Sequence, residues 1–143
     1  MKVQVMKMTQ KIFPANENAL SDVLRFIEDE LERVNCPAKT MMSISVAIEE
    51  IFVNIASYSY GQDKGDVVVR FGFDSHTNTA TFQISDKGIA FNPLKQNDPD
   101  ITLSAEERKI GGLGIFITKK TMDNISYAYE NGENILTMKK SIN

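Results

Sequence analysis

Two polar side chains one helical turn apart, Glu50 and Asn54, are the first candidates for chemistry in this sequence. They lie in a segment, about 37–60, whose apolar residues recur three and four apart, a pattern typical of a helix with one buried stripe. At about 100° per residue the two side chains are about 40° apart, whereas Glu49 lies about 140° from Asn54. A carboxylate there can accept a proton, and a carboxamide oxygen can ligate Mg²⁺. The simpler alternative is a solvated glutamate and an asparagine that hydrogen-bonds the following loop.

A second candidate is Asp86, which follows a strand-like alternation of apolar residues and is followed two positions later by Gly88. A carboxylate at the end of a strand can accept a hydrogen bond from an exocyclic amine. A glycine backbone, which carries no Cβ, lets a flat ring approach closely. The alternative interpretation is an ordinary Asp-x-Gly turn.

The third candidate is a run of glycines, Gly111, Gly112 and Gly114, at the start of an expected helix. The first turn of a helix has unpaired N–H groups, and these donors together with the helix dipole suit a phosphate group. The run is neither a Walker A sequence nor a Gly-x-Gly-x-x-Gly fingerprint. Taken alone, glycines before a helix are more often just a flexible entry to it.

The elements that would hold these side chains follow in the order β-α-α-β-β-loop-α-β-β. We expect strands at about 3–13, 67–73, 80–84, 125–129 and 135–139, and helices at about 16–36, 37–60 and 113–122. The segment 86–112 loses periodicity and contains a capping-box pattern for a short helix at Ser104–Glu107. Turn residues at 74–78 and at Asn131–Gly132 predict hairpins. The order therefore favours an α+β fold, a two-layer sandwich with helices on one face of a mixed, mostly antiparallel sheet.

The composition narrows the class of protein. A length of 143 residues indicates one domain, 1–143. Sixteen lysine and arginine residues against nineteen aspartate and glutamate residues give a net charge of −3, which argues against a nucleic-acid-coating surface. A single cysteine, Cys36, and a single histidine, His76, exclude an internal disulfide and a multi-histidine metal centre. No uninterrupted apolar run approaches 18 residues, so we expect no membrane span and a reduced, cytoplasmic setting.

The order of the three motifs resembles the GHKL superfamily, the ATP-binding fold of gyrase, the heat-shock chaperone, histidine kinases and mismatch-repair ATPases. Its N-box resembles Glu50–Asn54, its G1 box resembles Asp86–Gly88, and its G2 box resembles Gly112–Gly114. The resemblance extends from about residue 12 to residue 140. It implies a Bergerat-type ATP-binding fold with a nucleotide lid at about 89–112.

Within that superfamily the sequence is most similar to the bacterial anti-sigma-factor serine/threonine kinases. The helix of the N-box ends in Tyr60, and the G1 box continues to Phe91. The helix after the G2 box ends in Met122 and Asp123. The resemblance implies an anti-sigma factor and protein kinase that phosphorylates an anti-sigma-factor antagonist and sequesters a sigma factor.

The same resemblance implies roles for individual residues and two cofactors, ATP and Mg²⁺. Glu50 would be the general base and Asn54 the ligand of Mg²⁺. The nucleotide would be held by five further residues: Asp86 at the adenine amine, Gly88 beside the base, Gly112 and Gly114 around the triphosphate, and Thr137 with a hydroxyl near adenine. The implied partners are the sigma factor and the antagonist, with no direct contact to nucleic acid or membrane, and a homodimer is left open.

The sequence departs from the family pattern immediately before the G2 glycines. Family members carry a basic residue there, near the γ-phosphate, whereas this chain has Ile110, preceded by Arg108 and Lys109. A second function therefore stays open: a non-catalytic nucleotide-sensing module whose lid reports ATP to a protein partner. A histidine-kinase catalytic half is disfavoured, because the sequence lacks a helical hairpin with a phosphoacceptor histidine.

Overall fold

The structure is a computed structural model that describes residues 8–59, 65–95 and 112–142. Within these ranges five strands form one sheet, in the order β1-β2-β3-β5-β4. The strands are β1 (Met8–Pro14), β2 (Asp66–Asp74), β3 (Thr79–Asp86), β4 (Asn124–Glu130) and β5 (Glu133–Ser141). The expected α+β class is confirmed, and the sheet, expected to be mixed and mostly antiparallel, is antiparallel at each pairing described.

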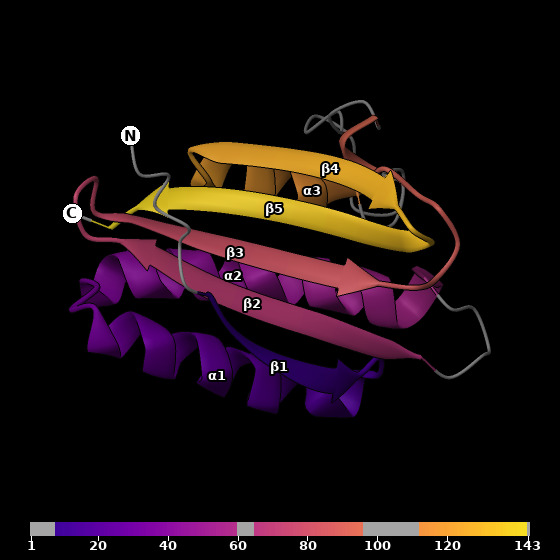
Figure 1. The fold of residues 1–143 in the computed structure, drawn as a ribbon, viewed down its shortest axis with the longest axis horizontal. Coiled ribbons are helices and arrows are strands. Elements are labelled where there is room, and N and C mark those ends of the chain that lie inside the picture. Colours follow the sequence, from indigo (N-terminus) through magenta and orange to yellow (C-terminus); the bar gives the residue numbers. More distant parts are fainter. Residues whose placement is uncertain (1–7, 60–64, 96–111, 143) are drawn as a thin grey trace.

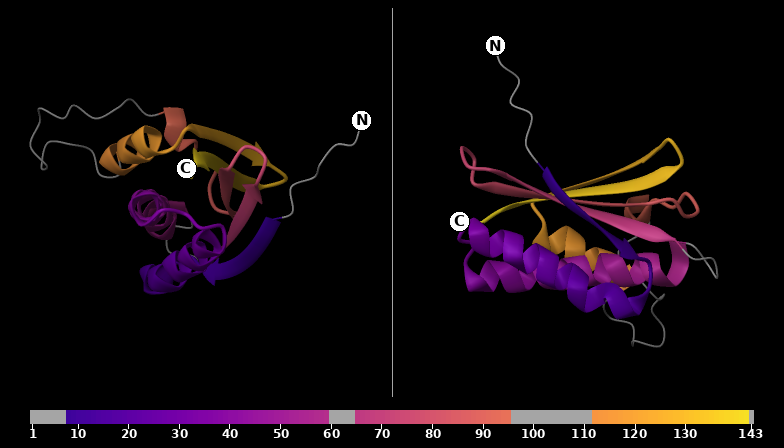
Figure 2. Two further views of the ribbon diagram at one scale, coloured as in Figure 1. Left: turned by 90° about the vertical axis from the view of Figure 1, so that its left-hand side faces the viewer. Right: turned by 60° about the horizontal axis from the view of Figure 1, so that its bottom comes forward.

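The helices of the described part cover one face of this sheet. They are α1 (Leu20–Arg33), α2 (Ala38–Asn54) and α3 (Gly112–Thr121). Helix α2 packs against both α1 and α3. The end-on view in Figure 2 shows the sheet curving around the three helices, which makes the two expected layers.

The core lies between the sheet and the helices, and alternation in the strands sets its composition. Buried apolar residues of β2 and β3 occupy alternate positions: Val67, Val69, Phe71, Ala80, Phe82 and Ile84. Phe71 and Phe82 are cross-strand partners whose ring centroids are 5.6 Å apart. Each large apolar side chain buried in this way contributes about 1.5–3 kcal/mol. A one-residue slip would turn the whole set toward solvent, so burial fixes the register and places Asp86 on the helix side, in phase with Ile84.

Two helix boundaries differ in detail from the expectation. The first helix begins with a 3-10 turn, η1 (Glu17–Ala19), and the side chain of Asn16 makes no capping hydrogen bond there. The backbone carbonyl of Asn16 instead accepts from the N–H of Ala19 at 3.1 Å. The segment expected as one helix, about 37–60, is α-helical to Asn54 and then π-helical over η2 (Ile55–Ser59). π-Helical turns are rare and frequently lie at functional sites.

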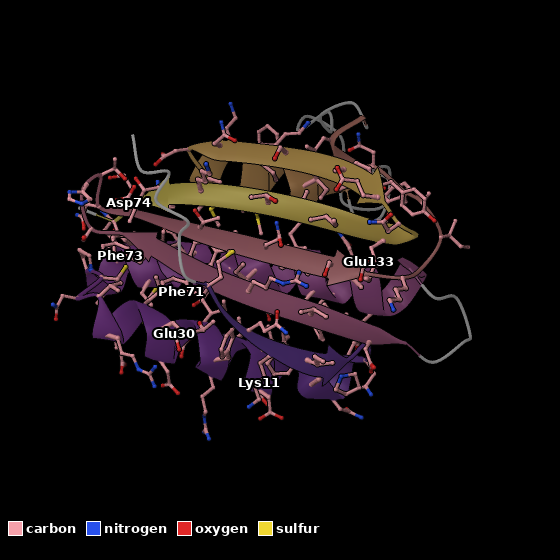
Figure 3. All side chains as sticks on the ribbon, viewed as in Figure 1. Lys11, Glu30, Phe71, Phe73, Asp74 and Glu133 are labelled. Atoms are coloured by element: carbon pink, nitrogen blue, oxygen red, sulfur yellow. The ribbon has the colours of Figure 1, made fainter. Side chains whose placement is uncertain are left out.

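The two hairpins lie at opposite ends of the molecule. Figure 3 shows Asp74, at the end of β2, at one end, and Glu133, the first residue of β5, at the other. Asn131 and Gly132 both have positive φ, 54° and 76°, as the expected tight turn requires. This turn sets the register of β4 against β5, and in the separate β3–β5 pairing Asn134 lies opposite Asp86.

By length and composition alone, the continuous helix Ala38–Ser57 is apolar enough to cross a membrane. That is weak evidence, because the core helix of a soluble protein passes the same test. Here Ile44, Ile48 and Phe52 are completely buried. Their burial accounts for the apolar residues on one side of the helix, whereas Met42 and Val46 are exposed.

Candidate functional site

Helix α2 presents Glu50 and Asn54 near its C-terminal end. The apolar residues Ile44, Ile48 and Ile51 bury one side of the helix and so fix its rotation. Glu50 and Asn54 lie outside that buried set, and both are half-buried. Asn54 is the last α-helical residue before the π-helical turn η2. The helix therefore holds a carboxylate and a carboxamide one turn apart at the border of the core.

Gly114, in the first turn of α3, packs directly on Glu50. A Cβ built on Gly114 would lie 2.5 Å from the carboxylate oxygen Oε2 of Glu50 and 3.2 Å from its Cβ. The Thr118 hydroxyl, which is completely buried, donates to the Gly114 carbonyl at 2.9 Å and ties this turn to the core. The absence of a side chain at Gly114 thus lets the glutamate lie against the start of α3, where the helix dipole favours negative charge.

Asp86, the last residue of β3, is almost completely buried, with 5% of its surface exposed. Its Oδ1 accepts two hydrogen bonds: one from the Gly88 backbone N–H at 2.9 Å and one from the Asn134 side-chain amide at 3.1 Å. A buried carboxylate is costly unless its oxygens are hydrogen-bonded, and these donors reduce that cost. The Asp86–Gly88 turn therefore has a structural basis, and it also holds the carboxylate at the end of the strand.

Asn134 and Tyr127 are the members of this site that sequence reasoning missed. The Asn134 amide nitrogen donates to the Ile89 carbonyl at 3.0 Å, and its carbonyl oxygen accepts from the Phe91 N–H at 3.1 Å. The Tyr127 hydroxyl donates a short hydrogen bond to the same carbonyl oxygen. The pKa of Tyr127 is raised, first by burial and then by the nearby charge of Asp86, against a lowering by the backbone N–H of Phe91.

These parts lie at one end of the molecule. In Figure 1 the C-terminal end of α2, the N-terminal end of α3, the end of β3 and the start of β5 are all on the right-hand side. Contacts join them in two groups, Glu50 with Gly114, and Asp86 with Gly88 and Asn134. The two carboxylates and two carboxamides supply oxygen ligands and hydrogen-bond acceptors. The first turn of α3 supplies backbone N–H groups that can bind phosphate. Together these groups have the chemistry that a nucleotide site requires.

Residues 13–140 match the family described as the histidine kinase-like ATPase domain. The chain belongs to this family. The match covers the three expected motifs and all the helices of the described part.

Curated relatives and solved structures agree with the family. The chain is 29% identical over 100 residues to the serine-protein kinase RsbW of Bacillus thuringiensis (strain Al Hakam), and 27% identical over 103 residues to that of Bacillus mycoides (strain KBAB4). These alignments cover 67% and 69% of this chain, and they span only 61% and 63% of the relatives.

Among solved structures, the RsbU and RsbW domains of Rv1364c from Mycobacterium tuberculosis align with a TM-score of 0.68 at 15% identity. That alignment covers 95% of this chain and 32% of that one. The histidine kinase domain of the Erythrobacter litoralis EL346 blue-light activated histidine kinase aligns with a TM-score of 0.55, also at 15% identity. It covers 74% of this chain and 46% of the other. At such identities the likeness concerns the fold.

One expected site residue of the ATPase domain lies elsewhere. Thr137 is on β5, but it is out of phase with Asn134, Leu136 and Met138 and faces the side of the sheet without helices. Its hydroxyl accepts a hydrogen bond from the Gln83 amide at 3.2 Å. We expected a Thr137 hydroxyl near adenine; strand alternation sends residues 134 and 137 to opposite faces, so this hydroxyl lies on the face away from Asp86.

Asn134, and not Thr137, is the residue of β5 that lies next to Asp86. A signal for it existed in the sequence: counting from Leu136 and Met138 in steps of two puts an asparagine on the buried face. A buried asparagine requires hydrogen-bond partners, and it was therefore a candidate.

The expected lid, about 89–112, is described only at its ends. At its start Leu94 packs against the core, and its N–H donates to the Asn92 side chain at 2.9 Å within a turn that includes η3 (Pro93–Lys95). At its end Gly112 is the first residue of α3. The expected short helix at Ser104–Glu107 and the departure at Ile110 lie outside the described residues.

Proposed function

We propose that this chain is an ATP- and Mg²⁺-dependent serine/threonine protein kinase that phosphorylates an anti-sigma-factor antagonist and sequesters a sigma factor. Membership of the histidine kinase-like ATPase family and similarity to proteins named serine-protein kinases support the proposal. The observation that carries it is the contact between Glu50 and Gly114. This contact brings an acid–base side chain to the helix end where phosphates bind.

The nucleotide would bind between the two groups of site residues. Asp86, a hydrogen-bond acceptor when ionised, would accept from the adenine amine, and Gly88 would let the base approach the backbone. Gly112 and Gly114 would shape the triphosphate site at the first turn of α3, where backbone N–H groups are unpaired. Nucleotide binding would thus involve the end of β3 with the turn after it and the first turn of α3.

The residues present fit a magnesium ion. Mg²⁺ prefers oxygen ligands and is held by one or two protein groups together with substrate phosphates and water. The Asn54 side-chain carbonyl would be the protein ligand, supplied at the end of α2. The bound ion would neutralise charge on the phosphates during transfer.

Glu50 would act on the acceptor hydroxyl. Its carboxylate would take the hydroxyl proton while the hydroxyl oxygen forms a bond to the γ-phosphorus. The bond between the γ-phosphorus and the β,γ-bridging oxygen would break at the same time, which leaves ADP and a phosphorylated partner. Because Glu49 is about 100° around the helix from Glu50, it would not reach the same atom. The resulting phosphate carries about −1.5 to −2 charge, which favours dissociation of the modified antagonist and frees the kinase for the sigma factor.

The test is phosphorylation of a natural partner. The protein is isolated from its own cells with its bound partners, incubated with Mg-ATP, and the partners are analysed by mass spectrometry. A phosphorylated serine or threonine, absent with Glu50→Gln, supports the kinase. A stable ATP-dependent complex with no phosphate on either partner favours the nucleotide-sensing module, the outcome that Ile110 keeps open. The same sample shows whether the assembly contains two copies of the chain, and fractionation of those cells tests the proposed cytoplasmic location.

A further inference from the structure

The side-chain amide of Asn134 forms its hydrogen bonds with other groups of the protein. Its amide nitrogen donates to Asp86 at 3.1 Å and to the Ile89 carbonyl at 3.0 Å, with the Gly88 carbonyl at 3.4 Å. Its carbonyl oxygen accepts from the Phe91 N–H at 3.1 Å and from the Tyr127 hydroxyl. Two donor hydrogens and two acceptor lone pairs are thus engaged. A bound base could reach Asn134 only by breaking one of these bonds, so Asn134 acts through its neighbours.

The loop after β3 depends on this asparagine for its position. Ile89 and Phe91 are large apolar residues, yet 73% and 55% of their surfaces are exposed, so core packing of these side chains does not hold the loop. The bonds from Asn134 to the backbone of both residues do hold it. Asn134 is itself 7% exposed and lies within β5, a rigid support for a loop.

We propose that Asn134 is a positioning residue that orients the Asp86 carboxylate and the 88–91 loop for recognition of the 6-amino group of adenine. The inference rests on the proposed function, in which Asp86 accepts from that amine. Two donors on Oδ1, the Gly88 N–H and the Asn134 amide, restrict rotation of the carboxylate. Removal of the Asn134 donor takes away the hydrogen bond that links this carboxylate to β5. The loss should then appear as poorer discrimination between bases.

The experiment compares equilibrium binding of ADP and IDP in the presence of Mg²⁺. Hypoxanthine carries a carbonyl oxygen where adenine carries the amine, so the ratio of the two affinities reports on the acceptor at Asp86. Asn134→Leu should lower that ratio about 10-fold, toward the ratio of Asp86→Ala. The matched control is Gln83→Leu, also an amide-to-leucine change, at a position on β3 whose side chain bonds Arg70 and Thr137 on the opposite face of the sheet. It should leave the ratio unchanged.

A second variant separates positioning from loss of structure. Asn134→Asp keeps the size but places a carboxyl beside the Asp86 carboxylate, and two carboxylates in one site raise the pKa of one of them. As the pH is lowered from about 8 to about 5, the new carboxyl gains a proton and can donate to Asp86 again. The ADP/IDP ratio of this variant should therefore recover toward the wild-type ratio at the same pH. The titratable groups near this pair include Lys87, which follows Asp86 in the chain, and Tyr127 and Tyr129 of β4. Burial raises the pKa of Tyr127, so this hydroxyl keeps its proton throughout the range.

The outcomes distinguish the inference from the function beneath it. Equal losses of ADP and IDP affinity in Asn134→Leu, with the ratio preserved, would overturn the positioning role, and so would an Asn134→Asp ratio that does not respond to pH. If the wild-type protein binds ADP but does not prefer it to IDP, the role of Asp86 is wrong and the inference falls with it. If wild type binds neither nucleotide, the proposed function itself fails.

Discussion

Gly114 of α3 lies so close to Glu50 of α2 that a Cβ on Gly114 would not fit. The built Cβ would lie 2.5 Å from Glu50 Oε2 and 3.3 Å from its Cδ. Oε2 and Cδ belong to the far end of a flexible side chain, so a methyl group at Gly114 would displace the carboxylate before it separated the helices. The glycine therefore determines where the proton-accepting group lies.

Gly114→Ala should slow phosphoryl transfer more than it weakens nucleotide binding. Displacement of a reacting group by about 1 Å can cost about 100-fold in rate. Single-turnover transfer rates and ADP titrations measure the two effects separately. The same change in a Glu50→Ala background should have a smaller further effect on the rate, because Oε2 and Cδ are gone and only the 3.2 Å approach to the Cβ of residue 50 remains. Equal losses in both backgrounds would show that Gly114 acts independently of Glu50.

Glu50→Gln keeps the size of the side chain and removes the proton acceptor. A positioned general base accounts for about 10²–10⁴ in rate, so transfer should fall by that order while ADP affinity changes little. Glu49→Gln is the matched control, one residue earlier on the same helix and about 100° away from Glu50. Similar rate losses in the two variants would contradict the assignment of one helical face to the reaction.

Asn54→Ala should make ADP binding depend less on Mg²⁺. If the Asn54 carbonyl oxygen ligates Mg²⁺, its removal should reduce the gain in ADP affinity that Mg²⁺ provides by about 10-fold or more. Titrations of ADP with and without Mg²⁺ isolate that gain. An unchanged gain in the folded variant would assign the metal to other ligands.

The spacing of apolar residues predicted the architecture, the helix that carries Glu50 and Asn54, and the strand that ends in Asp86. Alternation in 67–73 and 80–84 predicted β2 and β3, and three-and-four spacing predicted α2, because each pattern is a local consequence of burying one face. The role of Asn134 did not follow, since its partners Asp86 and Phe91 lie more than forty residues away and meet it only through the β3–β5 register. The face on which Thr137 lies depends on the same strand: its position on β5 is odd relative to Asn134, so alternation places its hydroxyl on the opposite side of the sheet.

Asp86→Ala should have two separable effects. Without nucleotide, the Gly88 N–H and the Asn134 amide lose an acceptor, which should lower the free energy of unfolding by about 1–3 kcal/mol. With nucleotide, loss of the adenine contact should weaken ADP binding by about 10- to 150-fold. Chemical denaturation and ADP titration measure these in turn.

Asp74→Ala is the control for this variant. Asp74 also accepts from a backbone N–H two residues ahead, that of His76 at 2.9 Å, but it lies at the far end of the sheet (Figure 3). It should lower stability without changing ADP affinity. If Asp86→Ala likewise changes only stability, Asp86 is a structural turn residue.

Tyr127 should make the stability of the protein fall in alkaline solution. Burial, with a smaller contribution from the charges of Asp86 and Tyr129, raises the pKa of Tyr127 above its ordinary value of 10.0, although the Phe91 N–H lowers it in part. The folded state therefore holds this proton more tightly than the unfolded state does. The contribution of Tyr127 to the free energy of unfolding is fully present below about pH 10 and is lost as the pH rises above it.

Tyr127→Phe should flatten that loss of stability. At neutral pH the same change should lower the free energy of unfolding by about 0.5–1.5 kcal/mol, because the hydrogen bond to Asn134 is missing. Tyr129→Phe, on the same strand and 49% exposed, should retain the alkaline loss of wild type. Urea unfolding at a series of pH values between about 8 and 11 measures both slopes, and identical slopes in the two variants would mean that Tyr127 does not hold the proton the structure assigns to it.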